Sequence, residues 1–158
     1  MKHSDEFYMK QALKEAWKAY QEDEVPIGAV IVKDDKIIAR AHNKREASND
    51  PTSHAEINAL KKACKKLKSW RIPGCKIYVT IEPCSMCAGA LLWARIDEVI
   101  FGAEDQKGGS LVTSFKLYEQ PNLNHHPAVR GGVMRQECQD IIKGYFKAKR
   151  EAKTHEKI

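Results

Sequence analysis

Long apolar runs are missing from this sequence. No stretch approaches the roughly 18 apolar residues that a membrane-spanning helix requires. The first ten residues, MKHSDEFYMK, include no apolar segment of the kind found in signal peptides. The 158 residues contain no internal repeat and no Gly/Ser-rich linker, and their number is typical of one domain. We therefore expect a single domain over residues 1–158, located in the cytoplasm and without membrane contact.

Cysteine is scarce, and its number is odd. The five cysteines are Cys64, Cys75, Cys84, Cys87 and Cys138. Disulfide frameworks are typical of short secreted chains with an even number of cysteines, so this sequence indicates free thiols. Three of them, Cys64, Cys75 and Cys138, fall in predicted helices or strands, where a free cysteine commonly behaves as a small buried apolar residue. Cys84 and Cys87 are then candidates for metal binding or catalysis.

Positive charge exceeds negative charge, with 27 Lys and Arg against 21 Asp and Glu, and the net charge is +6. Two segments carry the excess. Residues 61–71 contain six basic residues and no acidic one, and residues 143–158 contain six basic and two acidic residues. Clustered positive charge favours a polyanionic partner, with nucleic acid first. Solvated helix faces are common and are the more frequent explanation of such a run, so the charge supports a nucleic-acid partner without establishing one.

The first half of the chain predicts a helix, a hairpin and a second helix. A helical stripe over residues 5–22 consists of Phe7, Leu13, Ala16, Trp17 and Tyr20. Segments 27–33 and 36–41 predict a hairpin that turns at Asp34-Asp35. Ser53 and Glu56 have the spacing of a capping box at the start of the second helix. That helix would bury the stripe Ile57, Leu60, Cys64 and Leu67 and expose its lysines.

The second half predicts a crossover unit and a final helix. Strand 76–81, helix 88–95 and strand 98–102 follow one another closely, which implies parallel pairing of the two strands. A helix is expected over about 136–150. Together these elements predict an α/β fold, a three-layer α/β/α sandwich with a mixed sheet that begins with a hairpin.

Three fragments of the sequence carry groups suited to chemistry: His54-Ala55-Glu56 at a helix start, Pro83-Cys84-Ser85-Met86-Cys87 after a buried strand, and Asn43 at the end of the hairpin. Two thiolates and one imidazole suit zinc. A structural zinc site normally has four protein ligands, whereas three leave a position for water, which is typical of a catalytic site. A carboxylate beside that water, here Glu56, is able to accept its proton.

Other interpretations of these fragments stay open. His54 and Glu56 alone would fit a capped helix with a surface histidine. Cys84 and Cys87 alone would fit a cytosolic dithiol oxidoreductase with a reversible disulfide. A zinc-stabilised RNA-binding module without catalysis would need a fourth ligand, for which the sequence offers His42, His125 or Cys75. The combination of both motifs within one α/β domain favours a catalytic zinc centre.

The combined pattern, H-x-E with P-C-x-x-C, resembles the signature of the zinc-dependent cytidine deaminase-like superfamily. Nearly the whole chain is similar to the bacterial tRNA-specific adenosine deaminases of the TadA type. The resemblance rests on these segments: 24–29 (EVPIGA), 41–43 (AHN), 50–57 (DPTSHAEI), 78–90 (YVTIEPCSMCAGA), 102–107, 123–125 (LNH) and the basic, aromatic helix that contains Tyr145-Phe146 and Lys149-Arg150.

This resemblance implies a mixed five-stranded sheet, one Zn²⁺ per subunit held by His54, Cys84 and Cys87, and a homodimer. It implies hydrolytic deamination of adenosine to inosine at the wobble position of a tRNA anticodon loop, by zinc-bound hydroxide with Glu56 moving protons. The substrate-binding residues that it implies are Val25, Asn43, Ala55, Pro83, Asp105 and Lys107. The basic residues at 61–68 and in the last helix would contact phosphates.

The sequence departs from the family pattern in two places. His126 stands where the family usually has Arg, and the loop Gly108–Ser114 lacks a second Gly-Ser pair. The zinc motifs are also shared with guanine and cytosine deaminases, and Trp93-Ala94-Arg95 is similar to a segment of some guanine deaminases. A deaminase of a free nucleobase or nucleoside is therefore the main alternative.

Overall fold

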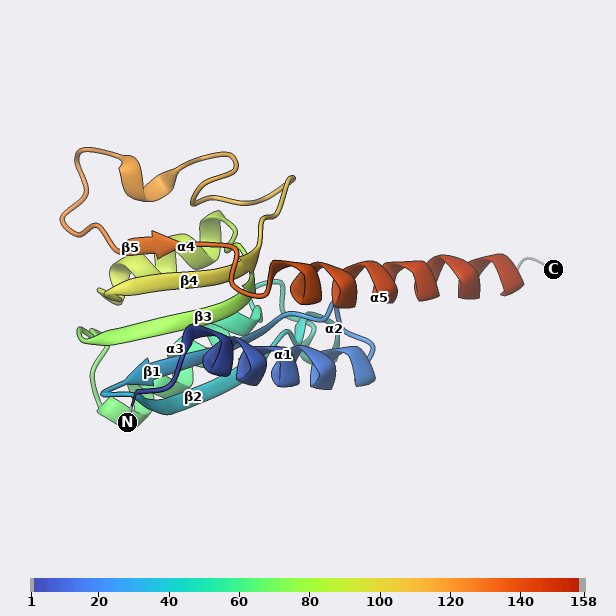
Figure 1. Ribbon diagram of the computed structural model, residues 1–158, viewed down its shortest axis with the longest axis horizontal. Helices are drawn as coiled ribbons and strands as arrows, with labels where there is room; N and C mark the ends of the chain where they lie inside the picture. The colour runs from blue at the N-terminus through green and yellow to red at the C-terminus, as the bar shows by residue number, and fades with distance from the viewer. Residues whose placement is uncertain (1, 157–158) are drawn as a thin grey trace.

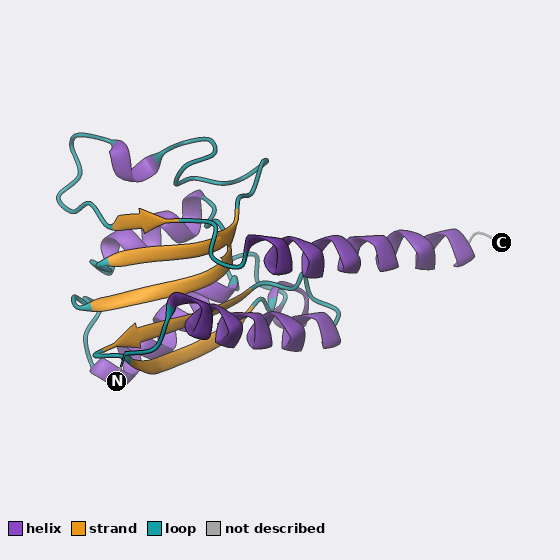
Figure 2. Cartoon of the chain, in the orientation of Figure 1, coloured by secondary structure: helices purple, strands orange, loops and turns teal. Residues whose placement is uncertain are grey.

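The computed structural model describes residues 2–156 and consists of one mixed sheet with helices on both faces (Figures 1 and 2). The strand order is β2-β1-β3-β4-β5. β1 pairs antiparallel with β2 and β3, whereas β3, β4 and β5 run parallel. The strands are β1 (Gly28–Lys33), β2 (Lys36–His42), β3 (Cys75–Ile81), β4 (Glu98–Ala103) and β5 (Ala128–Arg130). The predicted fold class is confirmed.

The hairpin forms where the sequence predicts it. β1 and β2 are joined by Asp34 and Asp35, both with positive φ (50° and 61°). Positive φ at both central residues matches the turn whose twist suits adjacent antiparallel strands, and aspartate tolerates that backbone conformation.

Helix α1 (Asp5–Gln21) lies on one face of the sheet, but it is rotated from the predicted stripe. It buries Tyr8, Met9, Ala12, Ala16 and Ala19, whereas Phe7 and Trp17 of the stripe are exposed. The cause is the close approach of the helix to β1 at Gly28, where an added Cβ would stand 2.5 Å from the Ala16 nitrogen. Small residues therefore face the sheet at this point, and the rings of Phe7 and Trp17 lie outside.

Helix α3 (Ala55–Leu67) covers the other face with α4 (Ser85–Trp93). Its fully buried side is an alanine row, Ala55, Ala59 and Ala63, which the predicted stripe did not include. Three residues of that stripe do pack on the core, Leu60 as a buried residue and Cys64 and Leu67 as partly buried ones. The predicted capping box was wrong. His54 is the N-cap residue, and the Ser53 hydroxyl bonds to Asn58.

The parallel crossover is confirmed, with Val79 of β3 beside Phe101 of β4. Helix α4 begins at Ser85, three residues earlier than predicted, because Cys84 is already its N-cap residue. Each of the two ligand-bearing motifs therefore stands at the start of a helix. Both helix starts lie at the same end of the sheet, just beyond the last residue of β3.

The remaining elements were predicted least well. The short helix α2 (Arg45–Ser48), the 3₁₀ turn η1 (Leu117–Glu119) and the edge strand β5 correspond to no predicted segment. Helix α5 (Arg135–Glu156) extends beyond the predicted end at residue 150 and projects away from the sheet (Figure 1). Its base lies against β4, where Cys138 contacts Gly102 so closely that no side chain fits at that glycine. Within residues 2–156, no helix is long and apolar enough to cross a membrane.

Candidate active site

A hollow of about 700 Å³ opens where β3 ends and where α3 and α4 begin. Its inner wall is formed by residues His54–Glu56 and Cys84, with Cys87 buried behind them. Its outer wall is formed by residues Glu104–Lys107 together with Ile142, Lys143 and Phe146 of α5. The hollow thus lies between the carboxyl end of β3 and the first half of α5.

The inner wall brings together one imidazole and two thiols. His54 Nδ1 lies 3.6 Å from Cys84 Sγ and 3.5 Å from Cys87 Sγ. All three ligand atoms lie within 4.8 Å of one another, and among the described residues this is the group suited to a metal ion. A tetrahedral zinc ion with usual bond lengths to nitrogen and sulfur would separate those two atom types by about 3.5 Å. The residues present therefore fit zinc.

The electrostatics of this group favour a thiolate. A hydrogen bond from the Cys87 thiol, supported by His54, lowers the pKa of Cys84 to about 3. The same bond and burial raise the pKa of Cys87, and the Cys84 contact raises the pKa of His54. Cys84 also occupies the N-cap position of α4, where the helix dipole stabilises negative charge.

Glu56 lies beside the three ligand atoms and faces the hollow from the first turn of α3. It is only 4% exposed, and burial raises the pKa of its carboxyl to about 7. Residues two apart do not share a helix face. His54 and Glu56 reach one place because His54 has extended backbone (φ −76°, ψ 157°) and stands just outside the helix.

Asn43, Val25 and Ala55 form the part of the hollow nearest the hairpin. The Asn43 amide is 2% exposed, donates to the Val25 carbonyl over 3.2 Å and accepts from the Arg45 N–H over 3.2 Å. These bonds fix the orientation of the amide at the wall. Pro83 is buried and is not among the residues that line the hollow, and its carbonyl accepts from the Ser110 N–H.

Asp105 and Lys107 lie in the loop that follows β4. The Asp105 carboxylate accepts from the backbone N–H groups of Lys107 and Gly108, at 3.0 and 3.2 Å. This loop is also bound to Glu82, a 2% exposed carboxylate. Burial acts to raise the pKa of Glu82, but donors from the loop, with Thr113 foremost, lower it below the usual value.

Sequence reasoning missed several residues of the hollow. Ile27 and Ile81 line it at strand ends, and Ile142 and Lys143 line it from α5. A signal for the helix residues existed, since Ile142 and Phe146 are apolar residues four apart on a helix rich in charged residues. The segment alone does not reveal which part of the protein that pair faces.

Other singled-out residues lie elsewhere. His125 Nε2 bonds to the Ile96 carbonyl, which precedes β4 and lies at the other end of the sheet. His126 bonds to the Tyr118 carbonyl. Neither histidine lines the hollow formed by described residues.

The three suggested fourth ligands are also placed apart from the metal-suited group within residues 2–156. The His42 ring lies between Glu15 and Glu22, at 3.0 and 2.9 Å. Cys75 is the first residue of β3, at the opposite end of that strand from Cys84. With His125 held at Ile96, the described residues offer three ligands.

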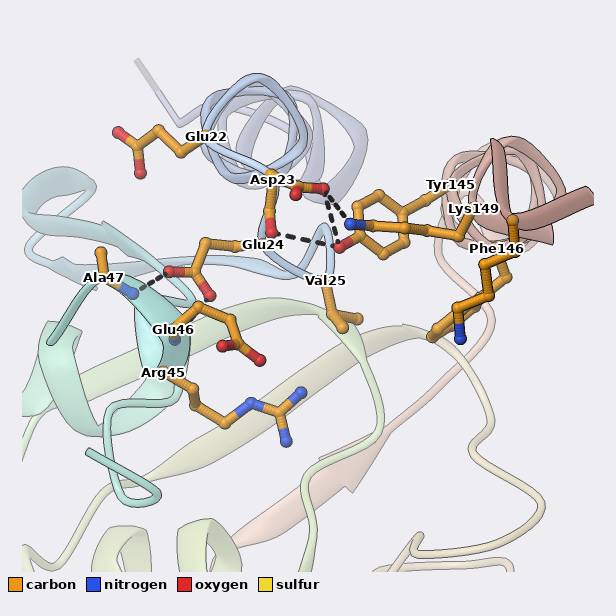
Figure 3. A pocket seen from close by; sticks show the side chains of 11 residues that line it. Glu22, Asp23, Glu24, Val25, Arg45, Glu46, Ala47, Tyr145, Phe146 and Lys149 are labelled. Carbon is orange, nitrogen blue, oxygen red and sulfur yellow. Dashed lines mark hydrogen bonds and ion pairs between the residues drawn. The ribbon is translucent and has the colours of Figure 1, made fainter. Parts of the chain in front are cut away.

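A second hollow of about 690 Å³ adjoins the first and shares Val25, Arg45 and Phe146 with it. Figure 3 shows Tyr145 and Lys149 of α5 pointing toward Asp23, with Lys149 Nζ 2.6 Å from the Asp23 carboxylate. On its other side, Glu24 accepts from the first N–H groups of α2. This hollow holds ion pairs and caps but no metal-suited group among the described residues.

Comparison with known proteins agrees with this site. The sequence profile of the MafB19-like deaminases matches residues 3–150, and the chain belongs to this deaminase family. A tRNA-specific adenosine deaminase from Bacillus subtilis is 47% identical over 149 residues, which cover 94% of this chain and 92% of that protein. Within the deaminases, the chain belongs with the tRNA-specific adenosine deaminases.

Two solved structures bear on the fold and on the substrate. One, from studies of A-to-I editing by tRNA:A34 deaminases, superposes with a TM-score of 0.83 at 44% identity and covers 85% of this chain and 98% of its own. The other, a guanine deaminase from Bacillus subtilis, has a TM-score of 0.64 at 36% identity and covers 80% and 83% of the two chains. Both are similar over most of their length, and the first is more similar in sequence and structure.

Proposed function

We propose that this protein removes the amino group of adenosine by hydrolysis at the wobble position of a tRNA anticodon, giving inosine and ammonia. The observation that carries the proposal is the inner wall, where a buried carboxylate adjoins a metal-suited group with three ligands. The tRNA substrate is supported by the relatives, which are named for it. Such a substrate would place the protein in the cytoplasm.

His54, Cys84 and Cys87 would hold one zinc ion per subunit. Their donor types and the 3.5–3.6 Å separations of nitrogen from sulfur suit that ion. When bound, zinc lowers the pKa of a coordinated water to about 7 and so supplies a nucleophile at neutral pH. The protein's contribution is to leave one position open and to place Glu56 beside it.

Glu56 would move the protons. Its carboxylate faces the hollow without belonging to the three-ligand group, so it is free to accept the proton of the attacking water. It would then give a proton to the ring nitrogen of adenine and assist the departure of ammonia. Water adds at the carbon that bears the amino group, and the carbon–nitrogen bond breaks as ammonia leaves.

The base would be held by the hairpin side of the hollow. Asn43 has its amide fixed by Val25 and Arg45, so it would present a preset hydrogen-bonding group to the edge of the base. The Ala55 backbone N–H would complete that contact, and Val25 would contribute apolar surface. The same role for Pro83 has less support, because Pro83 is buried and does not line the hollow. Asp105 and Lys107 would hold the flipped nucleotide and its neighbours. Anticodon bases are single-stranded and enter a pocket at lower cost than paired bases.

The RNA backbone would lie along α5. Lys143 and Phe146 line the first hollow, and Lys149 and Lys153 line the second, so basic and aromatic groups follow one face of this helix. The predicted contacts by the lysines of segment 61–68 have less support, because none of those described residues lines either hollow.

We also propose a homodimer, which the family resemblance implies. Light scattering of the purified protein would measure its mass directly. A mass near twice 17.9 kDa supports the dimer, and a mass near 17.9 kDa at working concentration contradicts it.

The decisive experiment compares substrates under one set of conditions. Purified protein is incubated with an anticodon stem-loop carrying adenosine at the wobble position, and separately with free adenosine, guanine and cytosine. Ammonia and inosine are measured. Inosine from the stem-loop alone supports the proposal. The matched control is the same stem-loop with guanosine at that position, which should release no ammonia.

A free-base deaminase is the second candidate, because the similar guanine deaminase structure shares most of the chain. Rapid ammonia release from guanine, with none from the stem-loop, would favour it. The non-catalytic RNA-binding module and the dithiol oxidoreductase predict no ammonia from any substrate. The first of these requires a fourth protein ligand, and His42, His125 and Cys75 lie apart from the group within residues 2–156.

A further inference from the structure

Glu82 is a buried carboxylate with no assigned part in the chemistry. It follows β3 directly and stands two residues before Cys84, and it is 2% exposed. Its backbone N–H donates to the Ala103 carbonyl over 2.9 Å, so its main chain is fixed by the end of β4. Its side chain points toward the loop that follows β4.

Among the described residues, the donors to that side chain all come from one loop. Oε2 accepts from the backbone N–H groups of Leu111, Val112 and Thr113, at 3.0, 2.8 and 3.1 Å. Oε1 accepts from the N–H of Asp105 over 3.2 Å and from the Thr113 hydroxyl. Consecutive N–H groups that converge in this way form an anion-binding nest, and here the chain's own carboxylate fills it.

The loop closes on Glu82 without spare room. Gly109 lies over the carboxylate, and an added Cβ there would overlap it and would stand 2.6 Å from the Asp105 carbonyl oxygen. A second connection runs from the Ser110 N–H to the Pro83 carbonyl over 3.0 Å. The chain from Asp105 to Thr113 is thus held against the turn that carries Cys84.

This loop supplies the outer wall of the hollow. Residues Glu104–Lys107 line it, and Asp105 is both a wall residue and a donor to Glu82. Hydrogen bonds to a charged group contribute more to stability than hydrogen bonds between neutral groups. A loop held by five such bonds keeps its wall residues in place even though Gln106 and Lys107 are exposed to solvent.

We propose that Glu82 is a positioning residue that fixes the outer wall relative to the ligand-bearing turn, and so sets where Asp105 and Lys107 meet the RNA. The inference rests on the proposed function. Glu82 also lines the hollow, but both of its carboxylate oxygens accept hydrogen bonds from the loop, so in this role it acts on the substrate through the loop. Its effect is therefore expected on substrate binding, whereas Glu56 acts on the chemical step.

The test is the substitution Glu82→Gln, which keeps the shape but replaces one acceptor oxygen with an NH₂ group. We expect KM for the anticodon stem-loop to rise about tenfold, as expected for the loss of one hydrogen bond to a charged acceptor, with kcat changed less than threefold. Metal content should stay at the wild-type ratio. Amide hydrogen exchange at residues 105 and 111–113 should accelerate about tenfold.

The matched control is Glu119→Gln, an exposed glutamate beside the same loop region. It removes one negative charge but leaves the nest of N–H groups around Glu82 intact, so KM and amide exchange should stay unchanged. Thr113→Val serves as a second variant if Glu82→Gln folds poorly. It removes one donor and keeps the side-chain shape, and we expect a KM increase of about threefold.

The outcomes separate the two proposals. Unchanged amide exchange at 105 and 111–113 in Glu82→Gln overturns the role of Glu82. So does an equal fall in kcat, metal content and melting temperature, which would indicate a purely structural residue. A wild type that forms no inosine overturns the proposed function instead, because the exchange measurement needs no substrate.

Discussion

The inner and outer walls of the hollow differ in how they are held. Ala55 of the inner wall and Cys87 behind it are fully buried and Glu56 is 4% exposed, and all three belong to helices packed on the sheet. In the outer wall, Lys107 and Lys143 are exposed and Phe146 is 42% exposed. The outer wall comes from an irregular loop and from a helix that covers only part of the sheet edge.

This difference indicates a division of work. Groups that take part in proton transfer and metal binding need fixed mutual geometry and a low-dielectric setting, which the packed inner wall provides. Groups that meet a large polyanion need access, which the exposed outer wall provides. Substitutions in the inner wall should therefore act on metal content and kcat, and those in the outer wall on KM and salt dependence.

The largest effect is expected from His54→Ala. It removes one of three ligands, so the protein should lose its bound metal and its deaminase activity together. Elemental analysis of natively prepared protein measures the first, and inosine formation measures the second. Cys64→Ala, at a half-buried thiol outside the group, is the control and should keep both. A full equivalent of metal in His54→Ala would show that this histidine is not a ligand.

Glu56→Gln should separate chemistry from metal binding. The amide keeps the size of the side chain but does not accept the proton of water, so kcat should fall about 10²–10⁴-fold. Metal content should stay at the wild-type ratio, since the three ligands remain. Single-turnover inosine formation is the measurement. A variant that retains more than a tenth of wild-type kcat contradicts the proton-transfer role.

A moderate effect is expected from the outer wall. Lys143 and Lys153 of α5 line the two hollows, and their joint substitution by Gln should reduce the salt dependence of RNA binding. Each lost phosphate contact lowers the slope of log affinity against log salt by about 0.7, so the pair should lower it by about 1.4. Titration of the stem-loop at several salt concentrations measures this slope.

The matched control for that pair is the substitution of Lys65 and Lys66 by Gln on α3. Both lysines are exposed, and neither lines a hollow formed by the described residues. The same loss of charge at this place should leave the slope almost unchanged. Equal reductions by both pairs would mean that the RNA also runs along α3, and the contrast between the walls would have to include that helix.

The smallest effect is expected from a substitution outside both walls of the hollow. Arg130 of β5 bonds to the Asp5 carboxylate and lowers the pKa of Asp5 below its usual 3.8, with Tyr78 also donating to it. The contribution of this pair to stability is therefore present above about pH 4 and is lost as pH falls through the lowered pKa. Arg130 is 45% exposed in its side chain, so we expect less than about 1 kcal/mol.

Asp5→Asn tests this contribution by thermal unfolding. At pH 7 the variant should melt about 2–3 °C below the wild type. At pH 3 the difference should shrink, because the wild-type carboxylate is then being protonated. Deaminase activity at 25 °C should not change. Asp34→Asn in the exposed hairpin turn is the control, and a larger shift there would refute the assignment.

The two walls also differ in how far the sequence predicts them. Each inner-wall motif is local, because His54 and Glu56 are adjacent to a helix start and Cys84 and Cys87 lie three apart at another. Residue types and short spacings suffice there. Ile142 and Lys143 reach the hollow only because α5 seats on β4 at the contact between Cys138 and Gly102. That contact joins segments far apart in the sequence, and no local pattern reports it.

The errors in the helices have one physical cause. The stripes predicted for α1 and α3 followed large apolar residues, whereas both helices turn small residues toward the sheet. Alanine at 12, 16 and 19 of α1, and at 55, 59 and 63 of α3, allows a close approach that larger side chains would prevent. Strand positions were predicted better, because both faces of this sheet are covered and the central strands are almost uniformly apolar.

The C-terminal end of α5 has little tertiary support. Residues 150–155 are nearly all exposed, and the helix runs past the end of α1 into solvent (Figure 1). Such a terminus is held only by its own backbone bonds, and short unsupported helices are marginal in water. Heat or a protease with a preference for lysine and arginine should therefore fray or clip this end first, while the sheet stays intact.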